Sequence, residues 1–198
     1  MSRESALSTR DRILDAAAAV MRERGMAHAT TKEIAKAAGL SEAALYKHFT
    51  DKTELFVRVL AERLPRFLPT IETLDVEAGT VVDNLRTVAE AAITFYADSF
   101  PISVSIFAEP KVLHAHRAAL RRTGAGPHKA NEALAEYLAA EKERGRIHAD
   151  ADPSSLAALV LGACFQHAFL HQFADDEQVD AAGAADRLIT ALAPALLP

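Results

Sequence analysis

The chain has 198 residues, of which half are hydrophobic and a quarter are charged, and its formal net charge is −5. These values are typical of a soluble globular protein with one large or two small domains. The single cysteine, Cys164, excludes an internal disulfide framework and any zinc site built from several thiolates. The sequence offers no charge-free apolar run of about 18 residues and no apolar leader, so we expect no membrane span, no secretion signal and a cytoplasmic location.

The charges are distributed unevenly along the chain. Residues 1–58 carry ten Lys/Arg against eight Asp/Glu, whereas residues 59–198 carry twelve against nineteen. The N-terminal segment is therefore the better candidate for a polyanionic partner, although nucleic-acid binding depends on local cation clusters more than on a sum.

The prolines predict where helices begin and end. The first is Pro65, and the eight prolines of the chain separate apolar-periodic stretches rich in Ala, Leu, Glu and Arg. Proline is tolerated in the first turn of a helix and excluded from its interior. The chain is therefore predicted to be all-α, with about nine to ten helices. The expected ranges are 9–24, 31–38, 42–48, 52–64, 80–99, 102–108, 111–122, 128–144, 153–173 and 181–193.

Two short helices are predicted around Gly39. Thr30 and Glu33 have the spacing of a capping box for the first of them, and Ser41 can cap the second. A glycine between the helices allows a sharp corner. In the second helix Leu45 and Phe49 are four apart and predicted to face a core, while the opposite face holds Ala43, Tyr46 and Lys47. This pattern fits a helix-turn-helix, or equally an ordinary αα corner with a solvated polar face.

Residues 12–60, "RILDAAAAVMRERGMAHATTKEIAKAAGLSEAALYKHFTDKTELFVRVL", resemble the N-terminal domain of the TetR family of bacterial transcriptional regulators. The resemblance implies a helix-turn-helix DNA-binding domain over 1–60 and an effector-binding and dimerisation domain over 61–198. It implies a ligand-responsive regulator, most often a repressor that a small effector releases from its operator, and not an enzyme.

The resemblance also implies which residues contact DNA. Phosphate contacts fall to helix N-termini, cations and hydroxyl or imidazole donors, which position the protein without reading sequence. These residues are Thr31, Lys32, Tyr46, His48 and Lys52. Base contacts fall to Glu42, Ala43, Ala44 and Lys47, because lysine can donate to guanine and glutamate can accept from cytosine. Two alanines leave little base readout, so DNA shape is expected to contribute.

The C-terminal part is expected to bind the effector and to dimerise. In the family the last two long helices form the dimer interface, here 153–173 and 181–193, and a two-fold dimer suits a palindromic operator. The candidate pocket residues are mostly aromatic and suit a small apolar or amphipathic effector. They are Phe95, Tyr96, Phe100, Phe107, His114, Phe165 and His167, although each aromatic can equally fill the core.

Three alternatives stay open. His167 and His171 have the spacing of a two-histidine metal ligand pair, with His114 and His116 upstream, so a metal-sensing regulator is one. Cys164 can be a redox switch or, more often for such a residue, a small buried hydrophobe. An all-α enzyme or small-molecule carrier with a structural N-terminal helix pair is the third, but no catalytic constellation supports it. We expect no cofactor and no bound metal.

Overall fold

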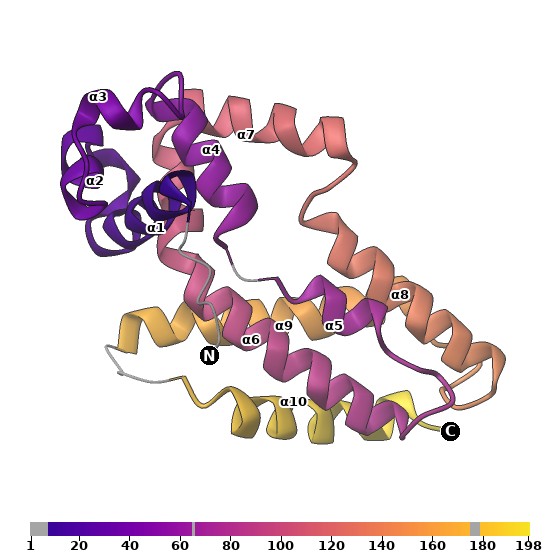
Figure 1. The fold of residues 1–198 in the computed structure, drawn as a ribbon. Helices are drawn as coiled ribbons and strands as arrows, with labels where there is room; N and C mark the ends of the chain where they lie inside the picture. The colour runs from indigo at the N-terminus through magenta and orange to yellow at the C-terminus, as the bar shows by residue number, and fades with distance from the viewer. Residues whose placement is uncertain (1–7, 65, 175–178) are drawn as a thin grey trace, which may run out of the picture. The chain divides into compact units, whose positions relative to one another are not determined.

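The computed structural model describes residues 8–64, 66–174 and 179–198. Over these residues the chain forms ten α-helices and one 3-10 turn, with no strand, which confirms the all-α prediction (Figure 1). The chain divides into two compact units. Unit 1 contains the residues up to 64 together with 101–124, and unit 2 contains 65–100 together with 125–198.

Unit 1 begins with α1 (Thr9–His28), α2 (Thr31–Ala37), α3 (Glu42–Leu45) and α4 (Lys52–Glu62). Helix α1 starts at the cap residue Ser8, whose hydroxyl accepts from the Asp11 amide at 3.1 Å, and it kinks at Gly25, where φ is 72°. That kink lies where the sequence predicts the end of the first helix. The apolar face of α1 packs against α2 and α4 and buries Ile13, Leu14, Ala17 and Met21 completely.

The corner between α2 and α3 forms as predicted. The Thr30 hydroxyl accepts from the Glu33 amide at 3.2 Å, and the Glu33 carboxylate accepts from the Thr30 amide at 3.3 Å, so the capping box is confirmed. Gly39 follows with a φ of 69°, a left-handed conformation in which a side chain would be strained. Ser41 then caps α3 by accepting from the Ala44 amide.

Unit 1 also contains a segment far along the sequence. Turn η1 (Ile106–Ala108) and helix α7 (Pro110–Thr123) belong to it, and α7 packs along α4 (Figure 1). Ile102, Ile106 and Val112 are buried in the same core cluster as the apolar residues of α1 to α4. The helix-turn-helix therefore shares one hydrophobic core with residues 101–124.

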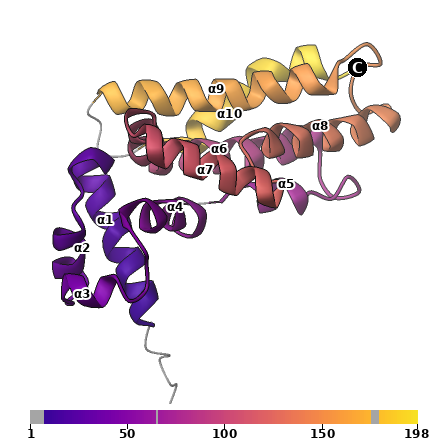
Figure 2. The ribbon, with the colours of Figure 1, turned by 90° about the horizontal axis from the view of Figure 1, so that it is seen from above.

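Unit 2 contains α5 (Leu68–Glu72), most of α6 (Val81–Ser105), α8 (His128–Glu143), α9 (Pro153–Ala174) and α10 (Ala181–Leu196). Helix α9 packs against α8 and α10, and α5 packs against α8 (Figure 2). Their shared core buries Leu85, Ile93, Leu134, Leu138, Cys164 and Ile189. The short helix α5 was not expected from the sequence.

Helix α6 corrects one sequence expectation. The prediction of two helices separated at Pro101 is wrong, because α6 runs through this proline. Pro101 has no amide to donate to the carbonyl of Ala97, one turn earlier. That carbonyl instead accepts from Gln172 Nε2 of α9 at 3.4 Å. A side-chain donor thus partly replaces the missing backbone hydrogen bond and lets the helix continue.

Two helical stretches, Val81–Ala108 and Pro153–Ala174, are long and apolar enough to cross a membrane by length and composition alone. The sequence did not suggest either. In unit 2 one side of α9 is buried against its helical neighbours, including Ala157, Val160, Leu161 and Cys164. A core helix of a globular protein passes the same test, so this is weak support for a membrane span.

Candidate functional site

The residues that follow the α2–α3 corner separate into a buried and an exposed set. Leu45 and Phe49 are buried in the unit 1 core, as predicted. Ala43, Tyr46, Lys47 and His48 are exposed. Helix α3 itself ends at Leu45, earlier than the expected 48, but the Phe49 amide still reaches the Leu45 carbonyl at 3.2 Å. The turn over 46–48 therefore continues the helical path and presents its polar side chains outward.

A hydrogen-bonded set joins the starts of α2 and α3. Thr31, the first residue of α2, is only 9% exposed, and its hydroxyl donates to the carboxylate of Glu42, the first residue of α3. The Tyr46 hydroxyl donates to the Thr31 hydroxyl oxygen at 3.3 Å. Three residues expected at a DNA surface thus contact one another.

The cationic residues near the α2–α3 corner differ in whether their side chains contact other side chains. Lys32 and Lys47 are exposed, and Lys52, the first residue of α4, lies over the Phe56 ring with Nζ 5.0 Å from its centroid. Arg24 pairs with Glu33 on the other side of the corner. Lys32, Lys47 and Lys52 can therefore each supply positive charge for phosphate binding.

The aromatic residues expected to line an effector pocket divide between the two units. Phe95, Tyr96, Phe100 and Phe165 come together in unit 2, where Tyr96 meets Phe165 edge-on with centroids 5.4 Å apart. Phe107 and His114 lie in unit 1, and Phe107 is 68% exposed. His167 lies in unit 2 and lines a pocket to which these rings do not contribute.

The ring cluster of unit 2 is larger than the sequence suggested. It also includes Phe67 before α5, at 4.9 Å from Phe95, and Phe169 and Phe173 on α9. The spacing of four between Phe165, Phe169 and Phe173 would have predicted that they share one face of a helix. Phe67 carried no such signal, because the helix that follows it is only five residues long.

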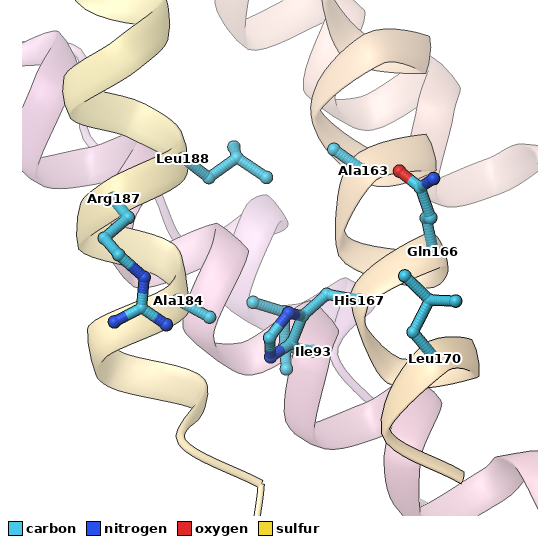
Figure 3. Close-up of a pocket in the computed structure, with 8 residues that line it drawn as sticks. All are labelled: Ile93, Ala163, Gln166, His167, Leu170, Ala184, Arg187 and Leu188. Atoms are coloured by element: carbon cyan, nitrogen blue, oxygen red, sulfur yellow. The ribbon is translucent and has the colours of Figure 1, made fainter. Parts of the chain in front are cut away.

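Two pockets open on unit 2. One, of about 350 Å³, lies between α9 and α10 with Ile93 of α6 at its base, and Figure 3 shows His167 extending into it. Its other polar lining groups are Gln166 and Arg187. The second, of about 440 Å³, lies between α5 and α6 and includes Phe67 and Phe95 of the ring cluster together with Thr87, Glu90 and Thr94.

Tyr96 of the ring cluster and the buried Cys164 are both held in their neutral forms. Burial raises the pKa of the Tyr96 hydroxyl to about 12, with a smaller contribution from Cys164. Burial likewise raises the pKa of the Cys164 thiol to about 12. Loss of water around a group disfavours its charged form, so this side of unit 2 is an apolar environment.

The histidines that suggest a metal-sensing regulator lie on α7 and α9. His167 and His171 lie on α9, and Cys164 of the same helix is buried. Among the described residues, no three His, Cys, Asp or Glu side chains are grouped so that they could hold a metal ion.

Comparisons with known proteins agree with the local geometry. Residues 13–59 match the family model for bacterial regulatory proteins of the tetR family. The chain is 40% identical over 58 residues to the HTH-type transcriptional regulator AcrR of Shigella flexneri, and 26% identical over 92 residues to the fatty acid metabolism regulator protein of Bacillus subtilis. These matches cover 29% and 46% of the chain, and only 27% and 47% of the two relatives.

Solved structures extend the similarity to the whole chain. A TetR-family protein from Mesorhizobium loti has a TM-score of 0.76 at 23% identity and covers 100% of both chains. SmeT, the repressor of the SmeDEF multidrug efflux pump of Stenotrophomonas maltophilia, has a TM-score of 0.66 at 22% identity over 96% of this chain and 91% of its own. At this level of identity the likeness concerns the fold.

Proposed function

We propose that this chain, whose N-terminal domain belongs to the TetR family of bacterial regulatory proteins, is a DNA-binding transcriptional regulator that responds to a small ligand. The observation that carries the proposal is the α2–α3 corner of unit 1. Its core face is filled by Leu45 and Phe49, and its outer face presents Tyr46, Lys47 and His48. A helix-turn-helix uses this arrangement to place its second helix in the major groove.

In this proposal residues 1–60 bind DNA and 61–198 bind the effector and dimerise. Phosphates are contacted by the α2 N-terminus with Lys32 and by Tyr46, His48 and Lys52, while Lys47 and the methyl groups of Ala43 and Ala44 face bases. A protein of this kind works in the cytoplasm, where the DNA is.

A salt series tests DNA binding directly. Each phosphate that the protein neutralises steepens the fall of affinity with salt. With a duplex taken from upstream of the chain's own gene, we expect a steep dependence for the wild type and a slope reduced by about one for Lys52→Ala. Lys111, exposed on α7, provides the matched control, and Lys111→Ala should leave the slope unchanged. A wild-type protein that binds no DNA at about 50 mM salt would contradict the proposal.

We further propose a homodimer formed through α9 and α10. Helix α9 exposes a row of large apolar side chains that a single copy of the chain does not cover, namely Leu159, Phe165, Phe169, Leu170 and Phe173. Burying such a face is favourable, and a two-fold dimer would offer two α3 segments to a palindromic operator. Sedimentation of the wild type and of Phe173→Asp tests this, since the charged residue should shift the protein towards monomer.

The effector in this proposal is an apolar or amphipathic small molecule that binds in the pocket between α5 and α6, beside Phe67 and Phe95 of the ring cluster. The aromatic walls of Phe67 and Phe95 adjoin a pocket with Thr87, Glu90 and Thr94, so one end of a ligand can be apolar and the other polar. A ligand that binds one of two protein conformations more tightly can shift the DNA affinity. The shift is limited by the difference between the ligand's binding free energies for the two conformations. Thermal shift screening with amphipathic ligands, repeated on Phe95→Ala, should show stabilisation that the variant loses.

A further inference from the structure

The Thr31 hydroxyl links the side chains of Tyr46 and Glu42 through two hydrogen bonds. The Thr31 hydroxyl has one proton and two acceptor lone pairs. It gives the proton to the Glu42 carboxylate and accepts the proton of the Tyr46 hydroxyl at 3.3 Å. The three groups form a directed chain from Tyr46 through Thr31 to Glu42, and each donor in it has an acceptor.

This series of hydrogen bonds joins separate elements of the corner. Thr31 opens α2, Glu42 opens α3 eleven residues later, and Tyr46 follows the end of α3. Thr31 is 9% exposed, so little of its side chain is open to solvent. Hydrogen bonds to an ionised group are stronger than those between neutral groups. The bond from Thr31 to the Glu42 carboxylate is therefore stronger than the bond from Tyr46 to Thr31.

We propose that Glu42 is a positioning residue for DNA binding and not a base reader. Its carboxylate fixes the Thr31 hydroxyl, and Thr31 in turn fixes the ring of Tyr46 on the exposed side of the corner. This inference rests on the proposed DNA-binding function and revises the expected roles of two residues. Glu42 acts through Thr31, and the Thr31 hydroxyl, whose proton is donated to Glu42, does not donate to a phosphate.

The charge of Glu42 supports this assignment. A carboxylate at a phosphate-binding surface repels the ligand, so Glu42 is expected to have a role that offsets this repulsion. Holding a nearly buried hydroxyl supplies one, because an unpaired buried hydroxyl is unfavourable. Replacing the carboxylate by an amide keeps an acceptor oxygen for Thr31 and removes the repulsion.

A positioning role for Glu42 predicts a distinctive pattern of DNA affinities among Glu42 and Thr31 variants. Glu42→Ala and Thr31→Val should each weaken DNA binding about tenfold, and by the same factor on every duplex of a set in which each base pair of the site is changed in turn. The double variant should bind DNA no more weakly than either single variant, because both changes break the same series of hydrogen bonds. Glu42→Gln should bind at least as tightly as the wild type, and Thr31→Ser should behave like the wild type.

A second measurement tests the hydrogen bond without DNA. In a double-mutant cycle of chemical unfolding, Glu42→Ala and Thr31→Val should be coupled by about threefold or more in the unfolding equilibrium constant. Circular dichroism of each variant checks that it folds.

The contrary results are specific. If Glu42 reads a base, Glu42→Ala should change the sequence preference at one base pair, and Glu42→Gln should bind DNA more weakly than the wild type. The loss of affinity in the double variant should then be the sum of the losses in Glu42→Ala and Thr31→Val. Any of these outcomes, or an uncoupled unfolding cycle, overturns the inference while leaving the proposed function intact. A wild type that binds no DNA overturns the proposed function, and the unfolding cycle then still decides whether Glu42 holds Thr31.

Discussion

Arg10 and Glu62 form a two-pronged ion pair between the first turn of α1 and the last residue of α4. The two guanidinium nitrogens of Arg10 lie 2.8 and 2.6 Å from the two carboxylate oxygens of Glu62. The next residue, Arg63, bonds Asp11 at 2.7 Å and Asp15 at 2.6 Å. Two arginines and three carboxylates thus hold the end of α4 to the beginning of α1 inside unit 1.

We predict a modest loss of stability when this link is cut. Both Arg10 and Glu62 are about a third exposed, so solvent screens their attraction. Arg10→Ala should lower the free energy of unfolding by about 0.5–1 kcal/mol, measured by urea denaturation. Arg22, an exposed arginine of the same helix, is the matched control, and its replacement by Ala should change stability by less than about 0.5 kcal/mol. Equal effects of the two changes would contradict the role of the pair.

The same region predicts a dependence of stability on pH. The hydrogen bond from Arg10 lowers the pKa of Glu62 below its usual 4.5, and bonds from Thr50 lower the pKa of Glu54 in the same way. A carboxylate with a lowered folded-state pKa stabilises the fold above its unfolded pKa and loses that stabilisation as pH falls. Stability should therefore decrease from about pH 5 downwards.

Glu62→Gln should flatten part of this decrease, because the amide cannot take up the proton. Chemical unfolding of both proteins at a series of pH values from 7 to 3 measures the difference between the curves. Parallel curves for the variant and the wild type would show that Glu62 is not one of the responsible groups.

Ile102 tests whether residues 101–124 share the core of unit 1 with α1 to α4. Its side chain is fully buried among residues of that unit. Ile102→Ala should lower the free energy of unfolding by about 2–4 kcal/mol, through lost burial and a residual cavity. Val104, two residues later and 51% exposed, should tolerate Ala with little change. Similar losses at both positions would contradict the shared core.

Cys164 should be a poorly reactive thiol. Its side chain is fully buried and burial raises its pKa to about 12, so at pH 8 almost none of it is thiolate. A chromogenic disulfide reagent should label the folded protein at least about a hundred times more slowly than the protein unfolded in guanidinium. Equally fast labelling of the folded protein would favour the redox-switch alternative.

The local features of unit 1 could be predicted because neighbours in sequence determine them. The capping box of Thr30 and Glu33, the positive φ of Gly39 and the burial of Leu45 and Phe49 all follow from spacing within a few residues. The chemistry around Thr31 could not, because its partner Glu42 belongs to the next helix, eleven residues away in sequence.

Helix α6 shows the same limit over a longer distance. Pro101 predicts a break when only its own segment is considered. The donor to the free carbonyl, Gln172, is 75 residues away in sequence from Ala97, and no local pattern announces it. For the same reason the sequence grouped Phe107 and His114 with the aromatic cluster of unit 2, whereas the fold assigns them to unit 1.

Selection of bound duplexes from a random pool tests the central claim, sequence-specific DNA binding by the α2–α3 corner, most directly. The wild-type protein should enrich one sequence pattern over several rounds. Lys47→Ala should enrich a pattern in which one position has lost its preference, and Lys111→Ala should reproduce the wild-type pattern. A pool that shows no enrichment with the wild-type protein at about 100 mM salt, where specific contacts outlast non-specific ones, would contradict the account.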